Sequence, residues 1–192
     1  MRLRHAAARV DKWLNAATAQ DLADGLEWYD RARREAERMA DASGLSVRSC
    51  AGVIAALSPR CQWASNVRAA EKLICAAGAG EAEPIVNGTL SNRAKAWRIA
   101  QGEDPDAVLG GPKVRAFFAN IMGDVDAVTI DVWAARAAEG RENPNAPMRR
   151  RYALCAEAFR RVGRSRDMHP RDVQAAVWTV YRRTNARATY DL

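Results

Sequence analysis

Apolar residues recur along most of the chain at spacings of three and four, which is the period of an α-helix. The alternation of apolar and polar residues that is typical of strands is nearly absent. Between Ala19 and Ala42, for example, a single helical face collects Leu22, Leu26, Tyr29, Ala32, Ala36 and Met39. The pattern therefore predicts an all-α protein of about nine or ten helices.

Glycines, prolines and small polar residues indicate where these helices begin and end. Gly44 is expected to stop one helix, and Ser46 and Ser91 are expected to cap two others. The predicted helices span residues 9–19, 19–42, 47–57, 62–77, 91–99, 112–122, 131–138, 149–161 and 170–183. Between helices we expect loops at 78–88 and 140–147, a turn-rich connection at 102–111 and a short extended stretch at 128–130.

The length and composition fit a single domain over residues 1–192, built as one compact body or as two helical lobes. Hydrophobic residues make up 48% of the chain, enough to bury a core. No run of eighteen apolar residues suggests a membrane span, and the charged N-terminus is not followed by the apolar stretch of a secretory signal. We expect a cytoplasmic protein, a monomer that does not bind membranes.

The cysteines and histidines do not form a metal-binding pattern. The four cysteines contain no C-x-x-C pair, and the chain has only two histidines. We therefore expect no metal and no cofactor, and we interpret Cys50, Cys61, Cys75 and Cys155 as reduced and mostly buried thiols.

The charge favours a polyanionic partner. Lysine and arginine number 30 against 23 acidic residues, which gives a net charge of +7. Cationic side chains displace counterions from phosphates, so this balance is compatible with DNA binding. Only four of the basic residues are lysines, namely Lys12, Lys72, Lys95 and Lys113.

The most informative stretch of the chain begins at a glycine-rich turn, Leu109-Gly110-Gly111, which leads into a helix with Pro112 at its start. The first N–H groups of a helix have no partner within it, so they form a site for phosphate. Lys113 lies in the first turn of this helix. Asp131 follows eighteen residues later, as the expected cap of another helix. We expect the two side chains to share one groove.

An amine and a carboxylate at such a groove are suited to breaking a glycosidic bond. A lysine in a partly desolvated cleft attacks as a neutral amine and forms a Schiff base. A nearby carboxylate stabilises the positive charge that builds on a sugar as its base departs. Considered alone, an aspartate at such a position is more often just a helix cap.

These two segments resemble the catalytic core of the helix-hairpin-helix DNA base-excision glycosylases, the group of endonuclease III and 8-oxoguanine DNA glycosylase. Their pattern is Leu-Pro-Gly-Val-Gly-x-Lys, an apolar helix and then Val-Asp-x-His. Gly111, Lys113 and the Ile130-Asp131-Val132 run match it. The resemblance implies a two-lobed helical bundle with its hairpin core at about 91–138. It also implies that Lys113 is the Schiff-base nucleophile and Asp131 the essential carboxylate.

Flanking segments extend the resemblance. Residues 92–99 are similar to the family's helix before the hairpin, and residues 55–62 to an apolar helix that ends in Leu-Ser with a glutamine soon after. The resemblance implies that Gln62 fills the gap left by a flipped nucleotide and that Trp63 acts as a wedge or stacking platform. Helix capping for Gln62 and core packing for Trp63 are the alternatives. The remaining predicted DNA-binding residues are Arg60, Gly110, Gly111 and Arg115.

The chain departs from the family pattern at three positions. Leu109 stands four residues before the lysine, where the family has a glycine, and Pro112 removes an N–H that would hold phosphate. Trp133 replaces the frequent histidine. We expect the hairpin to hold DNA more weakly or in a different alignment.

The resulting prediction is a DNA N-glycosylase with Schiff-base AP lyase activity that flips a damaged or modified base out of duplex DNA. Residues 169–178 also resemble a segment of phage-borne glycosylase-like proteins, whose setting is the host cytoplasm. Two alternatives follow, a phage base-hypermodification enzyme acting on a modified pyrimidine and a DNA-binding module without catalysis.

Overall fold

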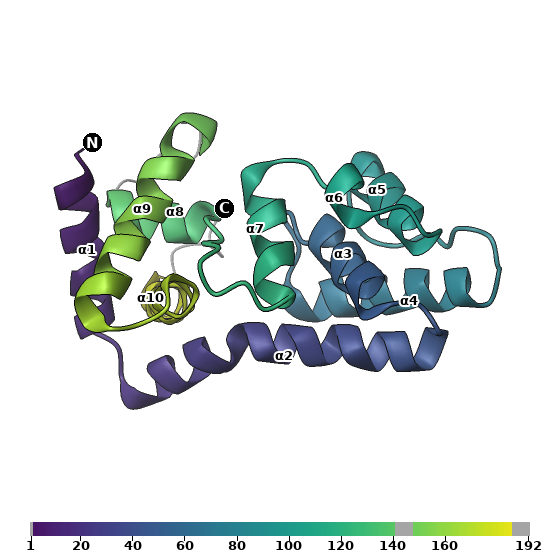
Figure 1. Ribbon diagram of the computed structural model, residues 1–192, viewed down its shortest axis with the longest axis horizontal. Coiled ribbons are helices and arrows are strands. Elements are labelled where there is room, and N and C mark those ends of the chain that lie inside the picture. Colours follow the sequence, from purple (N-terminus) through teal and green to yellow (C-terminus); the bar gives the residue numbers. More distant parts are fainter. Residues whose placement is uncertain (1, 141–147, 186–192) are drawn as a thin grey trace. The chain divides into compact units, whose positions relative to one another are not determined.

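The computed structural model describes residues 2–140 and 148–185 (Figure 1). Within these ranges the chain forms helices and no strand, so the all-α prediction is confirmed. Apart from Gly140, the predicted loop at 140–147 lies outside the described residues. The helices are α1 (Leu3–Asn15), α2 (Ala19–Ser43), α3 (Val47–Leu57), α4 (Trp63–Gly78), α5 (Leu90–Ala100), α6 (Pro105–Val108), α7 (Pro112–Ile121), α8 (Val132–Glu139), α9 (Met148–Arg166) and α10 (Pro170–Asn185).

The helices group into two compact units. The central unit is Asp30–Met122, and the terminal unit consists of the described residues before and after that range. The chain passes from one unit to the other inside α2 and again after Met122. The predicted hairpin core at 91–138 is therefore divided, because its second part begins the return to the terminal unit.

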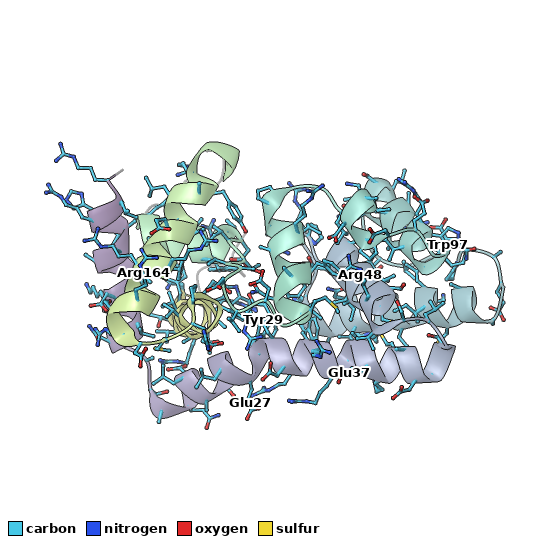
Figure 2. All side chains as sticks on the ribbon, viewed as in Figure 1. Glu27, Tyr29, Glu37, Arg48, Trp97 and Arg164 are labelled. Carbon is cyan, nitrogen blue, oxygen red and sulfur yellow. The ribbon has the colours of Figure 1, made fainter. Side chains whose placement is uncertain are left out.

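The central unit is built around α3, which contacts α4, α5, α6 and α7 (Figure 1). Every residue of α3 from Cys50 to its end is buried, as expected of a helix that is apolar on all sides. The Ser46 hydroxyl accepts a hydrogen bond from the Ser49 N–H, which confirms the predicted cap. At the exposed start of the helix, Arg48 pairs with Asp104 and Asp106 (Figure 2).

The terminal unit packs α1, α8, α9 and α10 against one another. Its core consists of apolar side chains from all four helices and from the segment that precedes α8. Among the buried residues are Val10, Ile130, Ala134, Phe159 and Val177. Many of the others are alanines, which allow the helices to approach closely.

Three local predictions were wrong. Helix α1 spans Leu3–Asn15 rather than residues 9–19, because the apolar spacing already starts at its first residues. Thr89, not Ser91, caps α5 and accepts a hydrogen bond from the Asn92 N–H. The connection at 102–111 contains the short helix α6, which Asp104 caps ahead of a proline in its first turn.

The face of α2 that was predicted to be buried includes the half-buried Leu22 and one exposed residue. Leu26 is 45% exposed, whereas Tyr29, Ala32, Ala36 and Met39 are buried. The neighbouring Gly25 explains the difference, because a Cβ there would lie 2.6 Å from the backbone of Ala176 on α10. Gly25 faces α10, so Leu26, one residue or 100° further round the helix, points away.

We predict that Gly25→Ala lowers the free energy of unfolding by about 1–3 kcal/mol, because the added methyl group meets backbone that has no room to move. In an open helix the same change would be stabilising. Ala23→Gly, at an exposed position of α2, is the control and should cost about 1 kcal/mol. Urea denaturation measures both variants, and a more stable Gly25→Ala protein would contradict the close approach.

The start of α2 is fixed by a capping box and an ion pair. The Thr18 hydroxyl accepts from the Asp21 N–H, and Asp21 accepts from the Thr18 N–H at 2.9 Å. Arg183, near the end of α10, donates to both oxygens of Asp21 at 2.9 and 2.8 Å. These hydrogen bonds, those from Arg183 foremost, lower the pKa of the Asp21 carboxyl to about 2, against the opposing effect of burial.

This lowered pKa makes the stability of the protein depend on pH in the acid range. The carboxylate of Asp21 contributes fully above its unfolded pKa of about 4, and its contribution is lost as the pH falls through about 2. We predict that Asp21→Asn lowers the free energy of unfolding by about 1–2 kcal/mol at pH 6 and that this difference shrinks toward pH 2. Urea titrations across this range measure it, and a difference independent of pH would contradict the assignment.

Candidate functional site

The glycine-rich turn lies between α6 and α7 in the central unit. Leu109 is buried and anchors the turn, while Gly110 and Gly111 are exposed. Gly111 precedes α7 with a φ of 79°, a conformation that side chains other than glycine rarely adopt. The Arg115 Nε–H donates to the Leu109 carbonyl at 2.8 Å, so this predicted DNA-binding residue also closes the turn.

Lys113 lies in the first turn of α7 and is half-buried. Its Nζ donates to the Ser58 hydroxyl at 2.7 Å and lies 5.2 Å from the centre of the Phe117 ring. A second lysine borders the same turn, because the Lys95 Nζ is 3.5 Å from the position that a Gly110 Cβ would occupy. Two of the four lysines therefore flank the glycines.

The other predicted DNA-binding residues of the central unit lie in or beside the turn from Ser58 to Gln62. Arg60 is exposed and has a positive φ of 58°. Gln62 precedes α4 as an exposed residue whose side chain makes no capping hydrogen bond, and Trp63 is the first residue of the helix and half-buried. The bond between Lys113 and Ser58 brings this turn and the glycine-rich turn together.

Asp131 belongs to the terminal unit, where it caps α8 as predicted. Its Oδ1 accepts a hydrogen bond from the Ala134 N–H at 2.8 Å. Its Oδ2 accepts one from the indole Nε1–H of Trp178, on α10, at 2.9 Å. The carboxylate is half-buried, and both of its oxygens have a donor from the protein.

The stretch that leads to Asp131 is extended and buried without a partner strand among the described residues. Tyr152 of α9 takes the place of that strand. Its hydroxyl donates to the Val128 carbonyl at 2.7 Å and accepts from the Ile130 N–H at 3.2 Å. Burial raises the pKa of Tyr152 to about 12, so the hydroxyl remains a donor at neutral pH.

A second tyrosine supports the same stretch from α2. Tyr29, labelled in Figure 2, is buried; it hydrogen-bonds to Thr129 and donates to the Gln174 Oε1 at 2.5 Å. Burial raises the pKa of its hydroxyl. The Arg171 guanidinium lies 5.8 Å from the centre of the Tyr29 ring. Asp131 therefore follows a segment that two tyrosines hold by its polar groups.

Sequence reasoning did not identify the residues around Asp131 in the terminal unit. None of Trp178, Tyr152 and Gln174 was singled out as a site residue. All three are distant from Asp131 along the chain, and no local motif links them to it. The sequence did offer one signal, since Trp178 and Gln174 carry polar groups on the otherwise apolar face of α10. Buried polar groups require partners, so these two side chains were candidates for contacts with a site.

We predict that Tyr152→Phe lowers the free energy of unfolding by about 1–3 kcal/mol, because two backbone groups of the buried stretch lose their partner. Thermal or urea denaturation measures the change. Tyr29→Phe is a useful comparison, since it removes side-chain bonds but leaves the backbone of 128–130 satisfied. A Tyr152→Phe protein as stable as the unchanged chain would contradict the supporting role of the hydroxyl.

The cysteines of the chain are free thiols. Cys50 and Cys155 are buried, and burial raises their pKa to about 11 and about 12. Cys61 is half-buried and Cys75 on α4 is exposed, so two of the four thiols are fully buried. No helix among the described residues is both long and apolar enough to cross a membrane.

A model of a family of unknown function, DUF7178, matches residues 1–185. The chain belongs to this family. No curated protein and no solved structure matches the chain. The region matched by DUF7178 contains every predicted site residue of the chain, including Lys113 and Asp131.

Proposed function

We propose that this DUF7178 protein is a DNA N-glycosylase with AP lyase activity, of the two-lobed helix-hairpin-helix type, that acts on a damaged or modified base flipped out of duplex DNA. The observation that carries the proposal is the position of Lys113. Its amine lies in the first turn of α7, directly after the glycine-rich turn, and contacts the turn from Ser58 to Gln62.

The DNA-binding part of the proposal rests on the central unit. The exposed backbone of Gly110 and Gly111 at the start of α7 suits a phosphate group. Arg115 is exposed and uses only its Nε–H within the turn, so its terminal nitrogens are available to a second phosphate contact. Gln62 and Trp63 at the start of α4 are suited to fill and wedge the gap in the duplex.

The chemical part requires Lys113 and Asp131 to act on one nucleotide. The negative charge of Asp131 stabilises the sugar cation as the bond between C1′ and the base breaks and the base leaves with the electron pair. The neutral amine of Lys113 bonds to C1′ and gives up a proton. The C1′–O4′ bond then breaks, with its electron pair going to O4′, which takes up a proton, and the nitrogen lone pair forms the C1′=N bond of a protonated Schiff base. Loss of a C2′ proton then breaks the C3′–O bond by β-elimination and cuts the strand.

Borohydride trapping tests this proposal directly. Duplex oligonucleotides that each carry one damaged or modified base are incubated with the protein and sodium borohydride, which reduces a Schiff base to a stable adduct. We predict a covalent protein–DNA adduct with at least one substrate, its loss in Lys113→Ala, and its retention in Lys95→Ala, which changes the lysine of α5 that borders the same turn. Asp131→Asn should slow base release by about a hundredfold or more.

Each other outcome identifies a different failure. Adduct formation that depends on Lys95 instead would contradict the role of Lys113. A mass change on the base without an abasic site would indicate a base-modifying enzyme. Binding of every duplex with neither adduct nor base release would indicate a DNA-binding module without catalysis.

A further inference from the structure

The environment of Asp131 in the terminal unit contains one contact that capping does not require. A helix cap needs only one side-chain oxygen, and the Oδ1 of Asp131 fulfils this by accepting from the Ala134 N–H. The second oxygen accepts from the indole N–H of Trp178, which comes from α10, 47 residues away along the chain. The indole therefore binds Oδ2, the oxygen of Asp131 that takes no part in the cap.

The indole of Trp178 is itself held in place by aromatic and cationic neighbours. The ring of Trp28 on α2 lies 5.2 Å from that of Trp178, centre to centre, at an interplanar angle of 37°. The Arg182 guanidinium, one turn further along α10, lies 4.6 Å from the centre of the Trp178 ring. These contacts restrict the ring and so restrict the direction of its N–H.

From this geometry we propose that Trp178 is a positioning residue, which holds the carboxylate of Asp131 in one orientation for the glycosidic step; its catalytic consequence rests on the proposed function. A carboxylate with a single hydrogen bond rotates about its χ2 torsion. With one donor on each oxygen, from α8 and from α10, it stays fixed. A charge that is already oriented stabilises a developing cation without the cost of reorganisation.

The substitution that isolates this contact is Trp178→Phe, which keeps an aromatic ring against Trp28 and Arg182 but removes the N–H. The matched control is Trp13→Phe, in the same unit. Trp13 also packs at the edge of the core, with its ring centre 4.9 Å from that of Tyr181. The hydrogen bonds of Asp131 come from Ala134 and Trp178, so the change at Trp13 leaves them in place. If both variants lose a similar free energy of unfolding, a slower base release in Trp178→Phe alone is due to the missing N–H and not to weaker packing.

Nuclear magnetic resonance tests the contact without reference to catalysis. The indole Nε1–H signal of Trp178 is assigned by its absence from the spectrum of Trp178→Phe. We expect this proton to exchange slowly with water and to resonate at an unusually low field. In Asp131→Ala the signal should move and its exchange should accelerate by about tenfold or more. A signal that Asp131→Ala leaves unchanged would overturn the proposal.

Single-turnover kinetics test the consequence. With a substrate found by borohydride trapping, Trp178→Phe should lower the rate constant of base release by about tenfold and leave the dissociation constant for DNA within about twofold. Trp13→Phe should leave both unchanged. An active enzyme whose base-release rate is the same in Trp178→Phe would overturn the positioning role, even if the contact is present.

The two experiments also separate this proposal from the proposed function. If the unchanged protein neither traps DNA nor releases a base, the glycosylase proposal fails and the positioning role fails with it. The magnetic resonance result then still decides whether Trp178 fixes the carboxylate. If trapping succeeds and only the Trp178 results are negative, the glycosylase proposal stands and the positioning role is withdrawn.

Discussion

A carboxylate at the start of a helix has two oxygens but only one capping bond to make, and in the terminal unit the second oxygen of Asp131 has a partner of its own. Its partner is an indole from another helix, which two further side chains restrain. The segment before it has its backbone satisfied by Tyr152 and its threonine by Tyr29. The polar groups of a buried stretch outside helix and strand need such side chains as partners.

In the central unit, neighbouring groups hold the side-chain amine of Lys113 in a similar way. Lysine side chains at a helix start usually extend into solvent, but Lys113 turns back to a hydroxyl at the end of α3 and to the face of Phe117. The bond to Ser58 joins the glycine-rich turn to the turn before α4, two segments that are distant in sequence. The predicted DNA-contacting residues of the unit lie in or beside these two turns. One hydrogen bond thus brings together residues that no continuous motif contains.

The sequence predicted the features that depend on local chemistry. Ser46 and Asp131 cap the expected helices, Gly44 follows the end of α2 as expected, and Gly111 precedes α7. Periodicity recovered the helices because each needs an apolar face, whichever neighbour covers it. The errors had both tertiary and local causes. The close approach at Gly25 turned Leu26 outward, and the choice between Thr89 and Ser91 as cap was too finely balanced for propensity to settle.

The residues that hold the site were harder to predict, because the bonds of Trp178, Tyr152 and Ser58 each join segments far apart in the chain. The proposed reaction requires Lys113 and Asp131 to act on a single nucleotide. A crystal structure of the borohydride-trapped complex measures this most directly. The account predicts a bond between the Lys113 Nζ and C1′, with the carboxylate of Asp131 within about 4 Å of the same sugar. A sugar bonded to another residue, or a carboxylate far from it, would contradict the account.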